Sequence, residues 1–213
     1  EVLEGKGGRE GAGTAVQDGP LGEELSAACL TDLAWAFASV GRPSPVVFGA
    51  LEQQLSLFPM DFRGHELPTA LWALHTAGHS TAAREAIESV TERVASAMPG
   101  QLRPAALATI VQVASAAHPG SQRVSHMLET VAAPLAAAAA AGQLNPQQLS
   151  FVAESYASVA PNFGSLSPSR AASSAMWEAL QASATQTLPS FRDESLARML
   201  CAVAAARLPA DSW

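Results

Sequence analysis

The sequence contains few aromatic and charged residues, only two cysteines and no long uninterrupted apolar run. Of its 213 residues, 6% are aromatic and 15% are charged, although 48% are hydrophobic. Cys29 and Cys201 are far apart and lack metal-ligand spacing, which argues against a disulfide framework and predicts two buried free thiols. The apolar run from Val131 to Ala141 is interrupted by Pro134 and is shorter than the roughly 20 residues of a transmembrane helix, so we expect no membrane insertion.

Alanine supplies much of the apolar content, whereas bulky residues that favour strands are scarce. Alanine is the strongest helix former because it loses no side-chain entropy in a helix. The chain is also long enough to bury one sizeable core. These properties together predict an all-α protein.

The formal net charge of -7 argues against a partner that is simply a polyanion. Residues 1–24 hold six acidic and two basic residues, a net charge of -4, which leaves -3 for the rest of the chain. This segment is also rich in glycine and has no hydrophobic periodicity, so we predict an extended acidic segment that lies against another molecule. The chain begins with Glu1 and not with Met, which we interpret as a mature form or a fragment of a longer protein.

An internal repeat organises the remaining residues, 25–213. The segment from Leu30 to Gly41 (LTDLAWAFASVG) matches the segment from Leu67 to Gly78 (LPTALWALHTAG) in its Leu, Trp, Ala and Gly residues, 37 positions later. Copies with weaker similarity follow at spacings of 40, 42 and 47 residues, starting at Leu107, Leu149 and Leu196. Second helices are expected between these copies, at residues 45–57, 81–97, 121–141 and 168–187.

A single helical hairpin cannot bury its own apolar face, whereas a stack of hairpins makes a continuous core. We therefore predict an α-solenoid of stacked antiparallel helical hairpins over residues 25–213, with four to five degenerate repeats of 37–47 residues, nine helices and no β-sheet. Large apolar residues recur at matching offsets within the copies and are predicted to form the repeat core: Trp35, Phe37, Trp72, Leu74 and Tyr156.

The segments from Leu67 to Gly78 and from Leu33 to Gly41 resemble the octotricopeptide repeat, in which a proline-containing lead-in precedes a Leu-Trp-Ala-Leu-type helix and a glycine. They are also similar to heptatricopeptide-like organellar helical repeats. The resemblance implies an α-solenoid that works in mitochondria or plastids, where such proteins bind organellar RNA or are built into organellar ribosomes. No RAP-type domain is visible at the C-terminus.

From this resemblance we expect a scaffold subunit of an organellar ribonucleoprotein, namely the mitochondrial ribosome, that contacts rRNA and neighbouring proteins. The alternative is a purely protein-binding subunit of a respiratory or photosynthetic complex, in a mitochondrion or a plastid. The acidic segment favours the second interpretation, and the repeat resemblance favours the first.

Three arginines stand four residues before the start of a repeat copy: Arg63, Arg103 and Arg192. A cation at this place opposes the helix dipole, so helix stability does not explain the pattern. In a solenoid the three side chains would lie along one edge, where they would suit phosphate contacts to RNA. Ion pairs with nearby acidic residues such as Glu66 and Asp193, or with a protein neighbour, explain the same pattern.

No motif for catalysis is present. The sequence lacks a Gly-x-Ser-x-Gly elbow, a phosphate-binding glycine loop and paired carboxylates in a plausible cleft, so we predict a protein that is not an enzyme and uses no cofactor. His75 and His79 have the spacing of two metal ligands on one helical face, but no carboxylate or thiol completes the set. We therefore predict no metal site.

Overall fold

The computed structural model describes residues 25–78, 81–97, 101–159 and 169–206 of this chain. Within these ranges it contains nine α-helices, two short 3₁₀ helices and no strand, which confirms the all-α prediction. The predicted extended segment, residues 1–24, lies outside the described residues.

The helices begin and end close to the predicted boundaries. Their bounds are α1 (Ala27–Ser39), α2 (Pro45–Leu57), η2 (Pro59–Asp61), α3 (Glu66–Ala77), α4 (Thr81–Ala97), α5 (Pro104–Ala117), α6 (Gln122–Ala140), α7 (Pro146–Val159), α8 (Ser169–Thr187), η4 (Leu188–Ser190) and α9 (Asp193–Ala205).

Local signals in the sequence set several of these ends. The Ser26 hydroxyl accepts a hydrogen bond from the Cys29 backbone N–H, at 3.3 Å, and so caps the start of α1. At the start of α7, the Asn145 side chain accepts from the Gln148 backbone N–H and the Gln148 side chain accepts from the Asn145 backbone N–H, both at 2.9 Å. After α1 the chain turns at Gly41, whose φ of 67° is one that residues with a Cβ rarely adopt.

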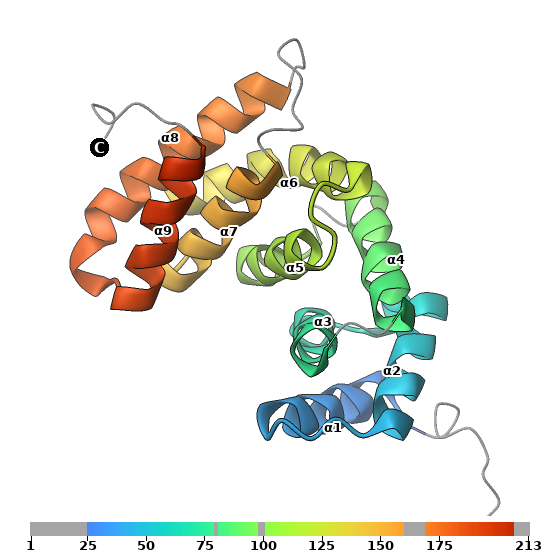
Figure 1. The fold of residues 1–213 in the computed structure, drawn as a ribbon. Helices are drawn as coiled ribbons and strands as arrows, with labels where there is room; N and C mark the ends of the chain where they lie inside the picture. Colours follow the sequence, from blue (N-terminus) through green and yellow to red (C-terminus); the bar gives the residue numbers. More distant parts are fainter. Residues whose placement is uncertain (1–24, 79–80, 98–100, 160–168, 207–213) are drawn as a thin grey trace, which may run out of the picture.

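The helices pack in two rows, because each helix contacts the helix two places along the chain. One row consists of α1, α3, α5, α7 and α9, and the other of α2, α4, α6 and α8. Figure 1 shows the odd-numbered row running from α1 to α9, with α2, α4 and α6 packed along one side of it. The neighbours α1–α2, α4–α5, α5–α6 and α7–α8 join the rows.

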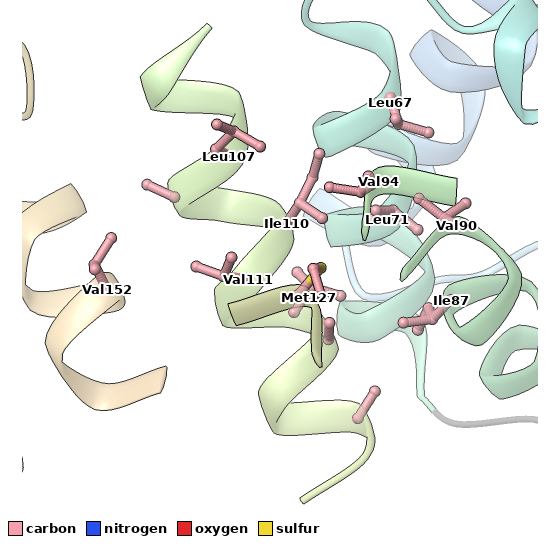
Figure 2. Packing of buried hydrophobic residues seen from close by; sticks show 14 of the residues in the cluster. Leu67, Leu71, Ile87, Val90, Val94, Leu107, Ile110, Val111, Met127 and Val152 are labelled. Carbon is pink, nitrogen blue, oxygen red and sulfur yellow. The ribbon is translucent and has the colours of Figure 1, made fainter. Parts of the chain in front are cut away.

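The repeat register determines which side chain covers which neighbour in the odd-numbered row. We number each repeat from its first leucine, so that Ile110 is position 4 and Val111 is position 5 of the third repeat. Figure 2 shows Ile110 pointing from α5 toward α3, whereas Val111 points away from α3, toward α7. Position 4 thus covers the preceding odd-numbered helix, and position 5 covers the following one.

Burial follows this register along the whole row. Position 4 is buried in the second to fifth repeats, but its first member, Leu33, is 36% exposed. Position 5 is buried in the first four repeats, but its last member, Leu200, is 58% exposed. Leu33 lies on the first helix and faces the side where a preceding helix would pack. Leu200 lies on the last helix and faces the side where a following helix would pack. Within the described chain neither side has a helix to cover it.

Tyr156 connects the two rows through its hydroxyl. The side chain is buried at position 8 of the fourth repeat, and its O–H donates to the backbone carbonyl of Leu128 on α6 at 2.5 Å. Leu74 is buried at the same position of the second repeat, whereas Phe37, in the first repeat, is partly buried against the core. Burial, and to a lesser extent the charge of Glu129, raises the pKa of Tyr156 above its ordinary value.

The register predicts different effects for one substitution made at position 5 of two repeats. Leu71 is 1% exposed and Leu200 is 58% exposed. We expect Leu71→Ala to lower the free energy of unfolding by about 2–5 kcal/mol, because it leaves a cavity, and Leu200→Ala to change it by no more than about 0.5 kcal/mol. Urea unfolding followed by circular dichroism measures both. Equal losses would contradict the register.

Tyr156 predicts a specific loss of stability at high pH. Above a pH of about 10, the unfolded chain releases the tyrosine proton and the folded chain retains it, so the free energy of unfolding falls as the pH rises. Tyr156→Phe is expected to remove this component and to cost about 0.5–1.5 kcal/mol at neutral pH. Since the chain has one tyrosine, phenolate absorbance follows this group alone. An ordinary phenolate midpoint in the folded protein would refute the prediction.

Candidate functional site

The two tryptophans predicted to lie in the repeat core are not both buried. Trp35 is 52% exposed, so its assignment to the core is wrong, and Trp72 is only partly buried against the core. Both occupy position 6 of their repeats. The physical reason is the register, because positions 4 and 5 point to the two neighbouring helices and position 6 lies on a face that neither neighbour covers.

Polar residues at position 6 of the later repeats indicate that this position lies on the surface. Position 6 is Gln112 in the third repeat, Glu154 in the fourth and Cys201 in the fifth. A fully buried position does not tolerate an amide and a carboxylate without partners, so these residues already marked position 6 as a surface position. Cys201 is exposed and Cys29 is partly buried, so the prediction of a buried thiol is wrong for Cys201.

Two adjoining hollows make a groove along the odd-numbered row, which we call the inner groove. The N-terminal hollow has a volume of about 500 Å³ and lies over α1, α3 and α5. Positions 3 and 6 of the first three repeats contribute Trp35, Thr69, Trp72 and Thr109. The remaining lining residues come from the N-terminal ends of α3, α5 and α7: Gly64, His65, Pro68, Arg103, Ala105, Ala106 and Gln148.

The C-terminal hollow, of about 700 Å³, continues the inner groove to α9. It shares Trp72, Thr109 and Gln148 with the N-terminal hollow, so the two spaces adjoin. Its other lining residues are mostly polar and come from α3, α5, α7 and the start of α9: His75, Gln112, Asn145, Pro146, Gln147, Phe151, Ser190, Arg192, Glu194, Ser195 and Arg198.

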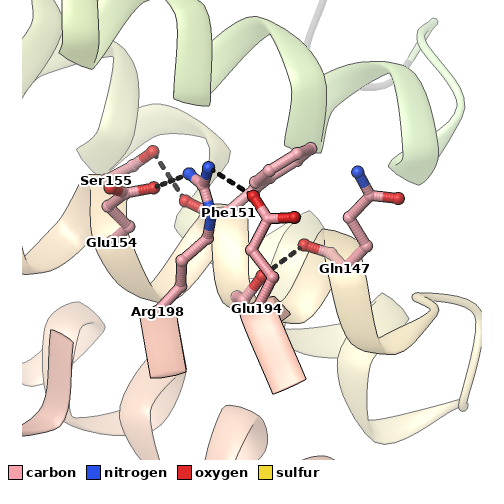
Figure 3. A network of polar contacts seen from close by, with 7 residues as sticks. Gln147, Phe151, Glu154, Ser155, Glu194 and Arg198 are labelled. Carbon is pink, nitrogen blue, oxygen red and sulfur yellow. Dashed lines mark hydrogen bonds and ion pairs between the residues drawn. The ribbon is translucent and has the colours of Figure 1, made fainter. Parts of the chain in front are cut away.

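Arg198 is held in the C-terminal hollow by two carboxylates. Its guanidinium donates to Glu154 on α7 at 3.1 Å and to Glu194 on α9 at 2.9 Å, and it lies 5.8 Å from the ring centre of Phe151 (Figure 3). The hydrogen bond to Glu194, with the charge of Glu154, raises the pKa of Arg198 above its ordinary value. The two carboxylates outweigh this one cation, so Arg198 adds no net positive charge to the groove.

The three arginines selected from the sequence lie at the groove or next to it, and all three are exposed. Arg103 lines the N-terminal hollow, Arg192 lines the C-terminal hollow, and Arg63 directly precedes Gly64, which lines the N-terminal hollow. The structure thus brings Arg103 and Arg192 to one continuous groove, from repeats that are separated in sequence.

Ion pairing does not account for these arginines within the described residues. None of the three side chains forms an ion pair there; the ion pairs found belong to Arg123 and Arg198. The carboxylate of Glu66 instead accepts a hydrogen bond from the backbone N–H of Arg63, at 2.8 Å. The predicted intrachain pairs with Glu66 and Asp193 are therefore wrong for the described part of the chain.

Metal ligands do not cluster in the described part of the chain. It contains no group of three or more His, Cys, Asp or Glu residues that could hold a metal ion. His79, one of the two histidines considered as a ligand pair, lies outside the described residues. None of the described helices is both long enough and apolar enough to cross a membrane.

No known family, curated protein or solved structure matches this chain. The function is therefore inferred from the residues of the groove.

The groove position of Trp35 predicts a contrast between two tryptophans. Trp177 on α8 is 7% exposed, against 52% for Trp35. We expect Trp177→Ala to lower the free energy of unfolding by about 3–5 kcal/mol and Trp35→Ala to lower it by less than about 1 kcal/mol. Chemical denaturation of the two variants measures this difference. A large loss of unfolding free energy for Trp35→Ala would show that Trp35 belongs to the core.

Proposed function

We propose that this chain is a non-catalytic helical-repeat scaffold, an α-solenoid of the octotricopeptide type, whose inner groove binds single-stranded RNA. Its place would be in an organellar ribonucleoprotein, the mitochondrial ribosome, in contact with rRNA and neighbouring proteins. The organellar location follows from the resemblance of two repeats, which is shared by proteins of mitochondria and plastids, and a plastid is the alternative.

The RNA proposal rests on the N-terminal hollow, which combines two indole rings with Arg103. Among the described residues, this arginine forms no ion pair and no carboxylate lines the hollow. Proteins that bind single strands without strong sequence preference use the same combination, namely a positively charged groove and aromatic rings on which bases stack. The full chain has a net charge of -7, so this part of the described surface departs from its acidic character.

The second candidate is a purely protein-binding subunit of another organellar complex, and the C-terminal hollow favours it. There, Glu194 lines the hollow and pairs with Arg198, which also pairs with Glu154 of α7. Carboxylates in a groove repel phosphates but can pair with basic residues of a protein partner.

Nuclease treatment separates the two candidates. The protein is expected to sediment with large particles in a lysate of its source organelle, and to leave them when the RNA is digested. Persistence in particles of unchanged size after complete digestion would favour the protein-binding subunit.

The three arginines predict how RNA binding responds to salt. Replacement of Arg63, Arg103 and Arg192 with Gln should leave the fold intact, because these side chains are exposed and form no ion pair within the described residues. Each arginine that neutralises a phosphate releases condensed counterions, so the slope of log K against log salt should flatten by about 2 units, at about 0.7 for each phosphate of a single strand. Titrations of single-stranded RNA at several salt concentrations measure this slope. A slope equal to that of the wild type would remove these arginines from the binding site.

A further inference from the structure

The N-terminal hollow holds two tryptophans, of which Trp35 is exposed and Trp72 is partly buried. The chain has four tryptophans in all, and Trp177 shows that the fold can bury one. Trp35 and Trp72 instead lie at the same position of successive repeats and line the same hollow. A large exposed aromatic ring in a hollow is typical of a contact surface, since tryptophan is enriched among the residues that dominate binding energy.

The charge around the two rings favours an anionic ligand. Arg103 lines the same hollow, and none of the described residues that line it is acidic. Arg103 forms no ion pair within the described residues, so its charge is available to a ligand. A ligand with flat rings and a negatively charged backbone therefore fits this hollow better than a purely apolar peptide segment does.

Three hydrogen-bonding groups of the hollow are occupied within the protein. The hydroxyl of Thr69 donates to the His65 carbonyl at 2.7 Å, and the hydroxyl of Thr109 donates to the Ala105 carbonyl at 3.3 Å. The side-chain carbonyl of Gln148 accepts from the Asn145 backbone N–H. The two indole rings and the arginine of the hollow can contact any base and any phosphate, an arrangement typical of binding by stacking with little sequence preference.

From these three observations we infer that the N-terminal hollow is a stacking site for unpaired RNA bases. Trp35 and Trp72 are the platforms on which bases stack, and Arg103 contacts the phosphate backbone beside them. The volume of about 500 Å³ lies within the range of small-molecule sites in proteins. The inference rests on the proposed function, because it names the part of the inner groove that holds the RNA and the way it is held.

Fluorescence anisotropy with two labelled probes tests the inference. The first is a short unstructured RNA of mixed sequence, and the second is an abasic oligomer of the same length, which keeps the phosphates and lacks the bases. The wild type should bind the RNA more tightly than the abasic oligomer. Trp35→Ala and Trp72→Ala should each weaken binding of the RNA by about 5- to 140-fold, the range that loss of one stacked base implies, and should leave binding of the abasic oligomer unchanged.

Four further variants separate stacking and charge from damage to the fold. Trp35→Phe and Trp72→Phe keep a ring and should retain most of the affinity. At the partly buried Trp72, phenylalanine also preserves most of the packing against the core. Arg103→Gln should weaken both probes alike and reduce the salt slope by about 0.7 units, the contribution of one phosphate on a single strand. Leu200→Ala removes an equally exposed apolar side chain that lines neither hollow, and should have no effect.

Different results would overturn the stacking site and the proposed function. If the wild type binds RNA and both Trp→Ala variants bind it equally well, the stacking site is overturned and the proposed function stands. Equal affinity of the wild type for the RNA and the abasic oligomer would overturn the stacking site in the same way. If the wild type binds neither probe, the proposed function itself fails, and a protein partner becomes the occupant of the hollow.

Discussion

The contact between each odd-numbered helix and the next one in its row organises the fold. A hairpin of two helices leaves an apolar face open, and the following repeat covers it. This contact occupies positions 1, 4 and 5 of each repeat with apolar side chains, as at Leu107, Ile110 and Val111. Positions 3 and 6 are released from packing by the same geometry. They form a surface that is held in place by a rigid core but is free to vary in chemistry, and the inner groove lies on it.

Much of the fold could be predicted because the responsible signals are local. The helices Pro45–Leu57 and Thr81–Ala97 were predicted to the residue, since proline, serine and glycine fix the geometry of helix ends within a few residues. Trp35 was assigned wrongly because apolar character alone does not distinguish a core position from an exposed one. Comparison of the repeats would have separated the two, since position 6 becomes Gln112 and Glu154 in later copies.

The site was less predictable because its groups meet only in three dimensions. Arg198 and Glu154 are 44 residues apart in sequence and lie on different helices, and no local pattern indicates that they pair. The arginine series was visible as a regular offset, but its meaning depended on side-chain partners. Whether Arg103 paired with a carboxylate or faced an open hollow was decided by packing between α3, α5 and α7. Such packing follows from the whole fold, and the spacing of residues does not reveal it.

If the odd-numbered row carries the RNA surface, bound single-stranded RNA should change hydrogen exchange along this row, which mass spectrometry with and without RNA measures. RNA is expected to slow exchange in the segment before α3 and in the first turns of α3 and α5, which line the N-terminal hollow. The even-numbered helices α2, α4 and α6 should exchange at unchanged rates, because none of their residues lines either hollow. Protection confined to those even-numbered helices, with unchanged exchange around the N-terminal hollow, would show that RNA does not bind the odd-numbered row.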